Sequence, residues 1–492
     1  MDQVSYLYGA SVQGIQRFIF QTNELKDIIG ASELVQKICT DFFEEFECSD
    51  PQQGEPVIQA AGNIKYIFHN EQDCRRAVLE FPKKVMMAAP GITISQAVVP
   101  IPDMDKYDDA AEELEAKLRA QRNKPFNSIT TGLMGIERSR KTGLPAVEYV
   151  AKDKEYIDLS TQKKKNESKT RKLCELSFGI DGLKDRVLPY DISEMTGKND
   201  WIAVIHADGN SLGEMVAQIG KDWRKLRQFS KDLEDSTIAA AQKAYEAVIK
   251  HDEYENKKEV IPFRPIVLSG DDMTMICRAD LAMEYTKQFI AHFEEETKKR
   301  KCPLTACAGI AFIKSSYPFY YGYELAENLC AEAKKDAKQR KTGGKIPSCL
   351  MFYKVQSSFV EDYQTMVEKE LTPGKGLSFV FGPYYLKEEP ERWTIDKLLH
   401  EAKHLNGKDL NEKDGNIVKS RIRHWMTLMH DDRGKAKQYE QRSEEILKDL
   451  KNEDILNIFV KTTKGEKRNS TSHYPAYDLL AIHTINQQQT ND

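Results

Sequence analysis

The first hundred residues alternate short apolar runs with segments of helical periodicity. A helix is predicted over residues 25–46, because Leu34, Ile38 and Phe42 recur at helical spacing on one face. A second helix is predicted over residues 73–87. The apolar runs predict strands at 4–10, 56–61, 64–68 and 92–99. The order strand, helix, hairpin, helix, strand is a β-α-β-β-α-β unit, the ferredoxin-like layout.

A second unit of the same order begins at Trp201. Its strands are predicted at 201–207, 263–268, 273–277 and 304–312, and its helices at 221–250, 281–297 and 323–338. A turn at Asp208-Gly209-Asn210 follows the first strand, and Ser269-Gly270-Asp271-Asp272 joins the two hairpin strands. The expected fold class is therefore α+β, with two ferredoxin-like domains and a helical C-terminal domain.

The rest of the chain is less regular. Beyond a strand-like run at 379–385, helices are predicted at 395–404, 417–429 and 437–459. The segment 161–172 holds six basic residues and one acidic residue, which favours a solvated linker. We expect five segments: the first unit at 1–109, an irregular insertion at 110–199, the second unit at 200–360, a mainly helical C-terminal domain at 361–486 and a disordered tail at 487–492.

Composition narrows the class of protein. With 492 residues the chain can hold about three domains, and its net charge of −5 argues against a general binder of polyanions. The nine cysteines include no C-x-x-C pair, which argues against a disulfide scaffold or a zinc ribbon and favours a reducing, cytoplasmic location. No apolar run is long enough to cross a bilayer, so no membrane association is expected.

Three carboxylates are the main candidates for chemistry. Asp208 ends an apolar strand, and Asp271 and Asp272 lie at the tip of an apolar hairpin. In a β-α-β-β-α-β sheet this strand and the hairpin are neighbours, so the three side chains should cluster. Aspartate is also a common turn residue, an explanation that suffices for Asp271 alone. Clustered carboxylates are typical of a site for two Mg²⁺ or Mn²⁺ ions, which support in-line phosphoryl transfer with loss of pyrophosphate.

The sequence around these carboxylates resembles a known family. H-A-D-G-N-S-L-G (206–213) and L-S-G-D-D-M (268–273) are similar to the catalytic palm of the type III CRISPR large-subunit family and of related nucleotidyl cyclases. The family's usual G-G-D-D hairpin differs here only at Ser269. The resemblance implies catalytic and metal-binding roles for Asp208, Asp271 and Asp272. It implies nucleotide-binding roles for Gly209, Asn210, Ser269, Gly270, Lys334 and Lys338.

The first unit resembles the other palm of the same family. The resemblance rests on residues 9–20, 25–34 and 59–64. Gly62 and Asn63 stand where the catalytic palm has its hairpin acids, so no catalytic metal pair is expected in this unit. The resemblance implies a second nucleotide site facing the first, and its candidate contacts are Ser11, Gln13 and Asn63. A purely structural role for this unit is the alternative.

Two features of the family are expected to be missing. The first palm begins within the first ten residues, so no HD nuclease is expected before it. Segments 139–146 and 159–163 resemble the family's zinc knuckles with the cysteines replaced, so no structural zinc is expected. The partners implied by the resemblance are ATP, guide and target RNA and the small subunits of a CRISPR effector complex. A homo-oligomer is a further option.

The resemblance implies conversion of ATP into a cyclic oligoadenylate second messenger in antiviral defence. Two alternatives stay open. One is a stand-alone synthase of a cyclic di- or trinucleotide outside a CRISPR complex, and the other is a non-catalytic, RNA-binding scaffold subunit of a type III effector complex. P-loop ATPase activity is not favoured, because the glycines and lysines of 341–348 lack the required spacing.

Overall fold

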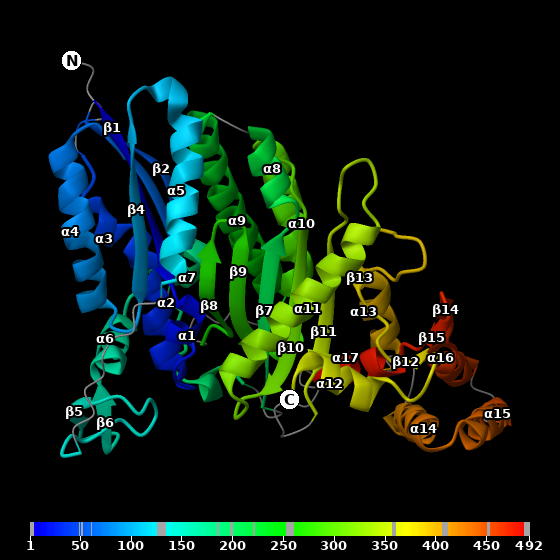
Figure 1. Ribbon diagram of the computed structural model, residues 1–492. Coiled ribbons are helices and arrows are strands. Elements are labelled where there is room, and N and C mark those ends of the chain that lie inside the picture. Colours follow the sequence, from blue (N-terminus) through cyan, green and yellow to red (C-terminus); the bar gives the residue numbers. More distant parts are fainter. Residues whose placement is uncertain are drawn as a thin grey trace.

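The computed structural model describes residues 4–48, 50, 53–60, 62–124, 134–184, 186–196, 200–219, 222–251, 260–356, 361–405, 412–449 and 453–486. Two sheets with their helices stand side by side, and a mainly helical region follows the second sheet (Figure 1). The fold class is α+β, as predicted from the sequence.

The first sheet contains β1 (Ser5–Gln13), β2 (Gly54–Ala60), β3 (Asn63–Phe68) and β4 (Thr93–Ile101) in the order β2-β3-β1-β4. Its neighbouring strands are antiparallel, which is the ferredoxin-like arrangement. Side chains alternate along β1, so Tyr8 packs with the core that includes helices α2 (Leu25–Cys39) and α4 (Glu71–Ala88). Leu7 packs on the opposite face, against α5 (Tyr107–Arg122). We call this unit palm one.

The helix predicted over 25–46 is interrupted in the structure. Helix α2 ends at Cys39, and the short helix α3 (Asp41–Glu44) follows after Thr40, whose backbone is not helical. A further short helix, α1 (Ile15–Ile19), lies between β1 and α2. Of the face predicted from the apolar periodicity, Leu34 and Ile38 are buried, whereas Phe42, beyond the interruption, is only half-buried and its neighbour Phe43 is buried.

The second sheet has six strands in the order β13-β11-β10-β7-β9-β8. They are β7 (Trp201–Gly209), β8 (Phe263–Ser269), β9 (Asp272–Arg278), β10 (Ala306–Lys314), β11 (Cys349–Lys354) and β13 (Tyr384–Tyr385). The four strands from β10 to β8 repeat the ferredoxin-like order, and β11 extends the sheet by pairing parallel to β10. We call this unit palm two.

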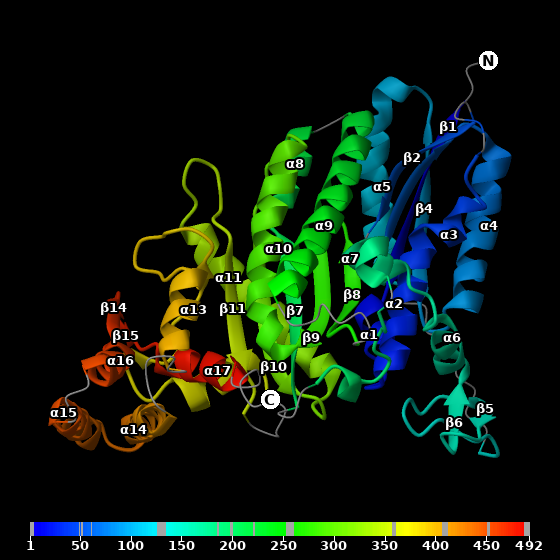
Figure 2. The same ribbon diagram turned by 180° about the vertical axis from the view of Figure 1, so that it is seen from behind.

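Helices cover both faces of palm two. α9 (Trp223–His251) and α10 (Ala279–Lys299) lie on one face (Figure 2), and α11 (Phe319–Gln339) lies on the other. The short helix α8 (Leu212–Ile219) follows β7. Side chains at 206 and 208 on β7 share one face because strand side chains alternate. The ring contact between His206 and Tyr323 shows that this face looks toward α11.

Palm one docks against palm two through α1, α2 and the start of α11. The Phe20 ring stacks on Tyr323 with centroids 4.8 Å apart. The Gln16 side-chain amide donates to the Tyr323 hydroxyl at 3.1 Å, and the backbone N–H of Phe319 donates to the Asn23 side chain at 2.6 Å. These contacts hold α1 and the loop after it against the start of α11.

The region between the palms is more ordered than its sequence suggested. Helix α5 runs across the boundary expected at residues 109 and 110, and the hairpin of β5 (Ala146–Val150) and β6 (Glu155–Asp158) leads into α6 (Leu159–Glu167) and α7 (Lys172–Leu183). The expectation of a solvated linker at 161–172 is wrong. Lys164 is buried, and its ammonium group donates to the carbonyl oxygen of Phe18 at 2.6 Å and to the Gln21 side chain at 2.8 Å.

The C-terminal region is mainly helical, as predicted. Its helices are α12 (Tyr363–Met366), α13 (Ile395–His404), α14 (Glu412–Asp431), α15 (Arg433–Asp449), α16 (Glu453–Thr463) and α17 (Ala476–Asn486). A small sheet contains β12 (Leu377–Ser378), β15 (Thr471–His473) and β14 (Glu466–Arg468). In the described part of the chain, no helix is both long and apolar enough to cross a membrane.

Two predictions for this region are wrong in detail. The helix predicted over 437–459 is two helices, α15 and α16, because a polar stretch at 451–454 interrupts the apolar stripe. The strand predicted over 379–385 is not continuous: within this range the structure has only the short strand β13, and β12 lies just before it. Pro383 has no N–H to donate to a sheet at this point. The tail predicted to be disordered, 487–492, lies outside the described residues.

Candidate active site

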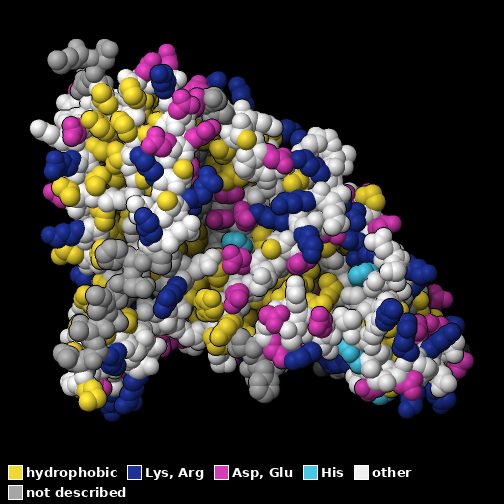
Figure 3. All heavy atoms as spheres, in the orientation of Figure 1, with side chains coloured by type: hydrophobic (Ala, Val, Ile, Leu, Met, Phe, Trp, Pro, Cys, Tyr) yellow, Lys and Arg dark blue, Asp and Glu magenta, His cyan; other side chains and the backbone are white. Residues whose placement is uncertain are grey.

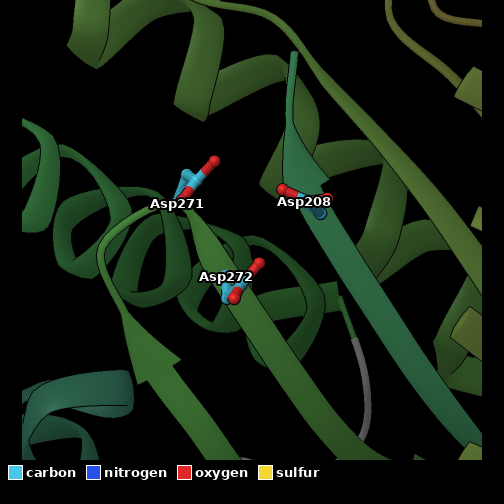
Figure 4. A group of neighbouring side chains, drawn as sticks. All are labelled: Asp208, Asp271 and Asp272. Atoms are coloured by element: carbon cyan, nitrogen blue, oxygen red, sulfur yellow. The ribbon is translucent and has the colours of Figure 1, made fainter. Parts of the chain in front are cut away.

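The three predicted carboxylates meet at one end of the palm-two sheet. Asp208 is the penultimate residue of β7, Asp272 opens β9, and Asp271 lies in the turn between β8 and β9. Because Ala207 pairs with Met273 across the two strands, Asp208 comes to lie beside Asp272. The three side chains converge (Figure 4), and one carboxylate oxygen of each lies within 4.8 Å of the others.

Glycines make this approach possible. Gly270 has a φ of +62°, a backbone conformation that residues other than glycine rarely adopt. Its carbonyl oxygen accepts a hydrogen bond from the Thr237 hydroxyl of α9 at 2.6 Å. Gly209 lies directly against Asp271, since a Cβ at this position would lie 2.8 Å from the Asp271 carboxylate. Gly209 and Gly270 therefore allow the three aspartates to approach one another.

The charges of the cluster are strongly coupled. Burial, followed by the negative charge of Asp208, raises the pKa of both Asp271 and Asp272. Burial lowers the pKa of the neighbouring His206 to about 4, so this histidine is neutral at physiological pH. Three converging carboxylates form an oxygen donor set suited to a hard divalent cation such as Mg²⁺ or Mn²⁺.

Lys334 of α11 lies at the edge of the cluster. Its ammonium group donates to the Asp208 carboxylate and to the carbonyl oxygen of Gly209, the latter at 2.8 Å. Burial alone would lower the pKa of this lysine, but the charge of Asp208 and the hydrogen bond raise it overall. The sequence predicted Lys334 as a triphosphate contact, whereas the structure pairs it with an acid of the cluster. Lys338, one turn further along α11, is exposed.

Asn210 holds the turn after β7 against the neighbouring strand. Its backbone N–H donates to the carbonyl oxygen of Thr305 at 2.7 Å, and its side-chain amide donates to the Thr305 hydroxyl at 3.0 Å. The side-chain oxygen of Asn210 is buried and has no hydrogen-bond partner among the described residues. A hollow of about 200 Å³ beside it is lined by Glu214 and Lys345, among others.

A cavity of about 190 Å³ separates the acidic cluster from palm one. Palm two contributes Ser269, Asp272 and Tyr323 to its lining. Palm one contributes polar side chains from α1, α2, the junction of α2 and α3, and β2; these are Gln16, Ser32, Gln36, Thr40 and Gln59. Figure 3 shows acidic side chains and a histidine in a hollow between the two palms. Sequence analysis missed Tyr323 and Gln16, since nothing local indicates that they meet across the interface.

The three residues predicted as contacts in palm one form a cluster of their own. The Ser11 hydroxyl donates to the Asn63 side chain at 3.1 Å, and the Gln13 side chain donates to the Ser11 hydroxyl at 3.1 Å. The cavity between the palms is lined by the adjacent Gly62, while Gln13 lines a different groove beside β4. The proposed nucleotide-binding role of these three residues stays a prediction.

Comparison with known proteins agrees with this geometry. Residues 201–342 match the model of the second palm domain of Cas10/Cmr2. The crystal structure of a Csm1–Csm4 cassette in complex with cA4 is 13% identical, covers 99% of this chain and 70% of its own, and has a TM-score of 0.59. Csm1 of T. onnurineus is also 13% identical, with coverages of 99% and 69% and a TM-score of 0.58. No match was found among curated proteins.

A third structure is similar in the same way. The Csm1–Csm4 subcomplex of the type III-A CRISPR–Csm interference complex is 12% identical, with coverages of 99% and 70% and a TM-score of 0.56. At such identities the likeness concerns the fold. The fold and the acidic cluster define a protein with two palm domains. The match of residues 201–342 to the second palm of Cas10/Cmr2, together with the Csm1-like fold of the whole chain, agrees with the resemblance to the type III CRISPR large-subunit family.

Proposed function

We propose that this protein is a nucleotidyltransferase that converts ATP into a cyclic oligoadenylate. One observation carries the proposal: Asp208, Asp271 and Asp272 converge at the end of the palm-two sheet, beside a cavity shared with palm one. A paired-palm arrangement accommodates two nucleotides, one supplying a hydroxyl group and the other an α-phosphate. Among the similar structures, Csm1–Csm4 cassettes in complex with cA4 and with AMPPNP support this choice of ligand.

The reaction we propose is an in-line displacement at phosphorus. The 3′- or 2′-hydroxyl oxygen of one ATP forms a bond to the α-phosphorus of the other, the bond to the β-phosphate oxygen breaks, and pyrophosphate leaves. Repetition and a final intramolecular step close the ring. The hydroxyl proton passes to solvent.

The residues have distinct roles in this proposal. Asp208, Asp271 and Asp272 would hold the divalent cations, and the raised pKa values of Asp271 and Asp272 reflect the cost of placing ionised carboxylates side by side. Two Mg²⁺ or Mn²⁺ ions would lower the pKa of the attacking hydroxyl and stabilise the leaving pyrophosphate. Lys334 brings a positive charge to the same edge, where the phosphates would bind. Gly209, Asn210, Ser269, Gly270 and Lys338 are proposed nucleotide contacts.

Partners are part of the proposal. The similar structures are Csm1 chains, some of them joined to Csm4, which supports assembly of this chain with other CRISPR effector subunits. Guide and target RNA are further partners that we propose. The nine cysteines are free thiols, which supports a reducing compartment.

The test is to incubate the purified protein with ATP and Mg²⁺ or Mn²⁺, with and without guide and target RNA, and to separate the products by chromatography. The matched control is the double variant Asp271→Ala/Asp272→Ala. A ring of adenylates made only by the unmodified protein supports the proposal. Product formed without RNA would point to the stand-alone synthase. If the variant and the unmodified protein give the same products under every condition, the proposal is wrong.

A further inference from the structure

A second concave site lies far from the acidic cluster. A groove of about 610 Å³ opens where the end of β11 meets helices α14 and α17. In Figure 1, α17 lies between the palm-two sheet and α14. Lys354, Gln356, Arg423, Thr427 and His430 contribute polar groups to its lining.

Positive charge dominates this groove. The ammonium groups of Lys354 and Lys314 lie 4.3 Å and 4.5 Å from the centre of the Trp201 ring, so two cations share one aromatic side chain. Arg423 is exposed and lines the groove together with Lys354. Among the described residues, Glu370 is the only acid in the lining, and its carboxylate accepts from the Tyr353 hydroxyl at 2.5 Å.

The half-buried Lys354 and the buried His483 indicate the same surplus of positive charge. Burial, together with the charges of Lys314 and Arg423, lowers the pKa of Lys354 to about 8. Burial, together with the charges of Lys419 and Arg423, lowers the pKa of His483 to about 4. His483 is 1% exposed, and neither of its ring nitrogens has a hydrogen-bond partner among the described residues. The positive charges of Lys354 and Arg423 repel each other, and an anion bound between them would relieve this repulsion.

We propose that this groove binds phosphate groups, with Lys354 and Arg423 as the principal contacts. The groove is open, and the side chains of its two cations, a lysine and an arginine, differ in length. This suits either consecutive phosphates of a single-stranded RNA or the polyphosphate of a free nucleotide. Its position separates it from the catalytic site. Trp201 begins the strand on which Asp208 is the penultimate residue, and seven strand residues at ~3.3 Å each span roughly 23 Å.

The experiment compares the full chain with the double variant Lys354→Gln/Arg423→Gln. The matched control, Lys83→Gln/Arg119→Gln, removes the same two charges from exposed positions in palm one. One arm measures binding of a fluorescent single-stranded RNA across a series of salt concentrations. The other measures the rise in melting temperature caused by inorganic tripolyphosphate. Neutralising two phosphates contributes about 25-fold to affinity near 0.1 M salt, so the groove variant should lose about that factor and the control should not.

The two arms distinguish the source of the phosphate. Loss of RNA affinity in the groove variant assigns the groove to a strand. Loss of only the tripolyphosphate effect assigns it to a free nucleotide. If the groove variant and the control behave alike in both arms, the proposal is wrong. Arg423→Gln alone, at an exposed position, repeats the test should the double variant fail to fold.

Discussion

The ammonium group of Lys334 is bonded to the carboxylate of Asp208, so a cation from α11 neutralises one acid of the cluster. The same group also holds the Gly209 carbonyl oxygen at 2.8 Å. A lysine in this position partly offsets the repulsion among the three acids, and its charge also acts to lower the pKa of Asp271 and Asp272. Within the described parts of the chain, neither of these two acids forms a comparable ion pair. Lys334 therefore balances the negative charge of the cluster, in addition to any contact with a phosphate.

The first prediction concerns this pair. Lys334→Gln removes the cation beside Asp208, and we expect nucleotidyl transfer to fall about a hundredfold, the cost of removing one positioned electrostatic group from a reacting centre. We also expect a lower melting temperature in the absence of divalent ions. The control is Lys335→Gln, because Lys335 is the next residue along the chain and its side chain is exposed. Product formation and thermal unfolding are the measurements, and equal rates for the two variants would contradict the assigned role.

The second prediction concerns the turn after β7. A Cβ at position 209 would lie 2.8 Å from the Asp271 carboxylate, so Gly209→Ala must displace that side chain. We expect the affinity for Mn²⁺, measured by calorimetry, to fall about 10- to 100-fold, as it does when groups that orient a metal ligand are disturbed. Gly213→Ala is the control, because a Cβ there meets nothing within 4 Å. Unchanged Mn²⁺ binding by Gly209→Ala would refute this explanation.

The third prediction is a pH dependence of stability. The folded protein keeps protons on Asp271 and Asp272 above pH 3.8, where the same groups ionise in the unfolded chain. The folded state then binds more protons, so these groups lower stability as pH rises from about 4 to their raised pKa values. Relative to Asp272→Asn, the wild-type melting temperature should fall by about 2–4 °C per pH unit in that window.

Divalent ions supply the control for this measurement. Mg²⁺ binds the ionised carboxylates, so a millimolar excess should reduce or reverse the difference between the wild type and Asp272→Asn. Differential scanning calorimetry with and without EDTA makes the comparison. A difference between the two proteins that is independent of both pH and Mg²⁺ would show that the carboxylates are not coupled as described.

The fourth prediction concerns the two segments that resemble zinc knuckles. Asp158 joins them, since its carboxylate accepts from the hydroxyls of Thr142 at 2.7 Å and Thr161 at 2.8 Å and from the Thr161 N–H at the start of α6. Asp158→Ala should cost about 2–3 kcal/mol of unfolding free energy, from a lost helix cap and two lost hydrogen bonds. Urea unfolding checks this. Asp153→Ala, at an exposed ion pair, should cost under about 1 kcal/mol.

Local patterns determined the elements that carry the site. The apolar runs of β7, β8 and β9 are buried strands wherever the sequence predicted them, and the turn residues at their ends are the glycines and aspartates expected there. The repeated β-α-β-β-α-β order could also be predicted, because it depends only on the order in which helical and strand-like hydrophobic patterns follow one another along the chain. The clustering of Asp208 with Asp271 and Asp272 followed from that order.

Contacts between distant segments were decided by the tertiary structure alone. The pairing of Lys334 with Asp208, of Gln16 with Tyr323 and of Asp158 with Thr142 depends on how whole elements pack. Lys164 illustrates the reason. In the sequence it belongs to a basic run typical of a solvated segment, yet α1 and the loop after it provide a carbonyl oxygen and an amide oxygen that make its burial tolerable. Periodicity reports which face of an element is buried, and only packing decides what that face meets.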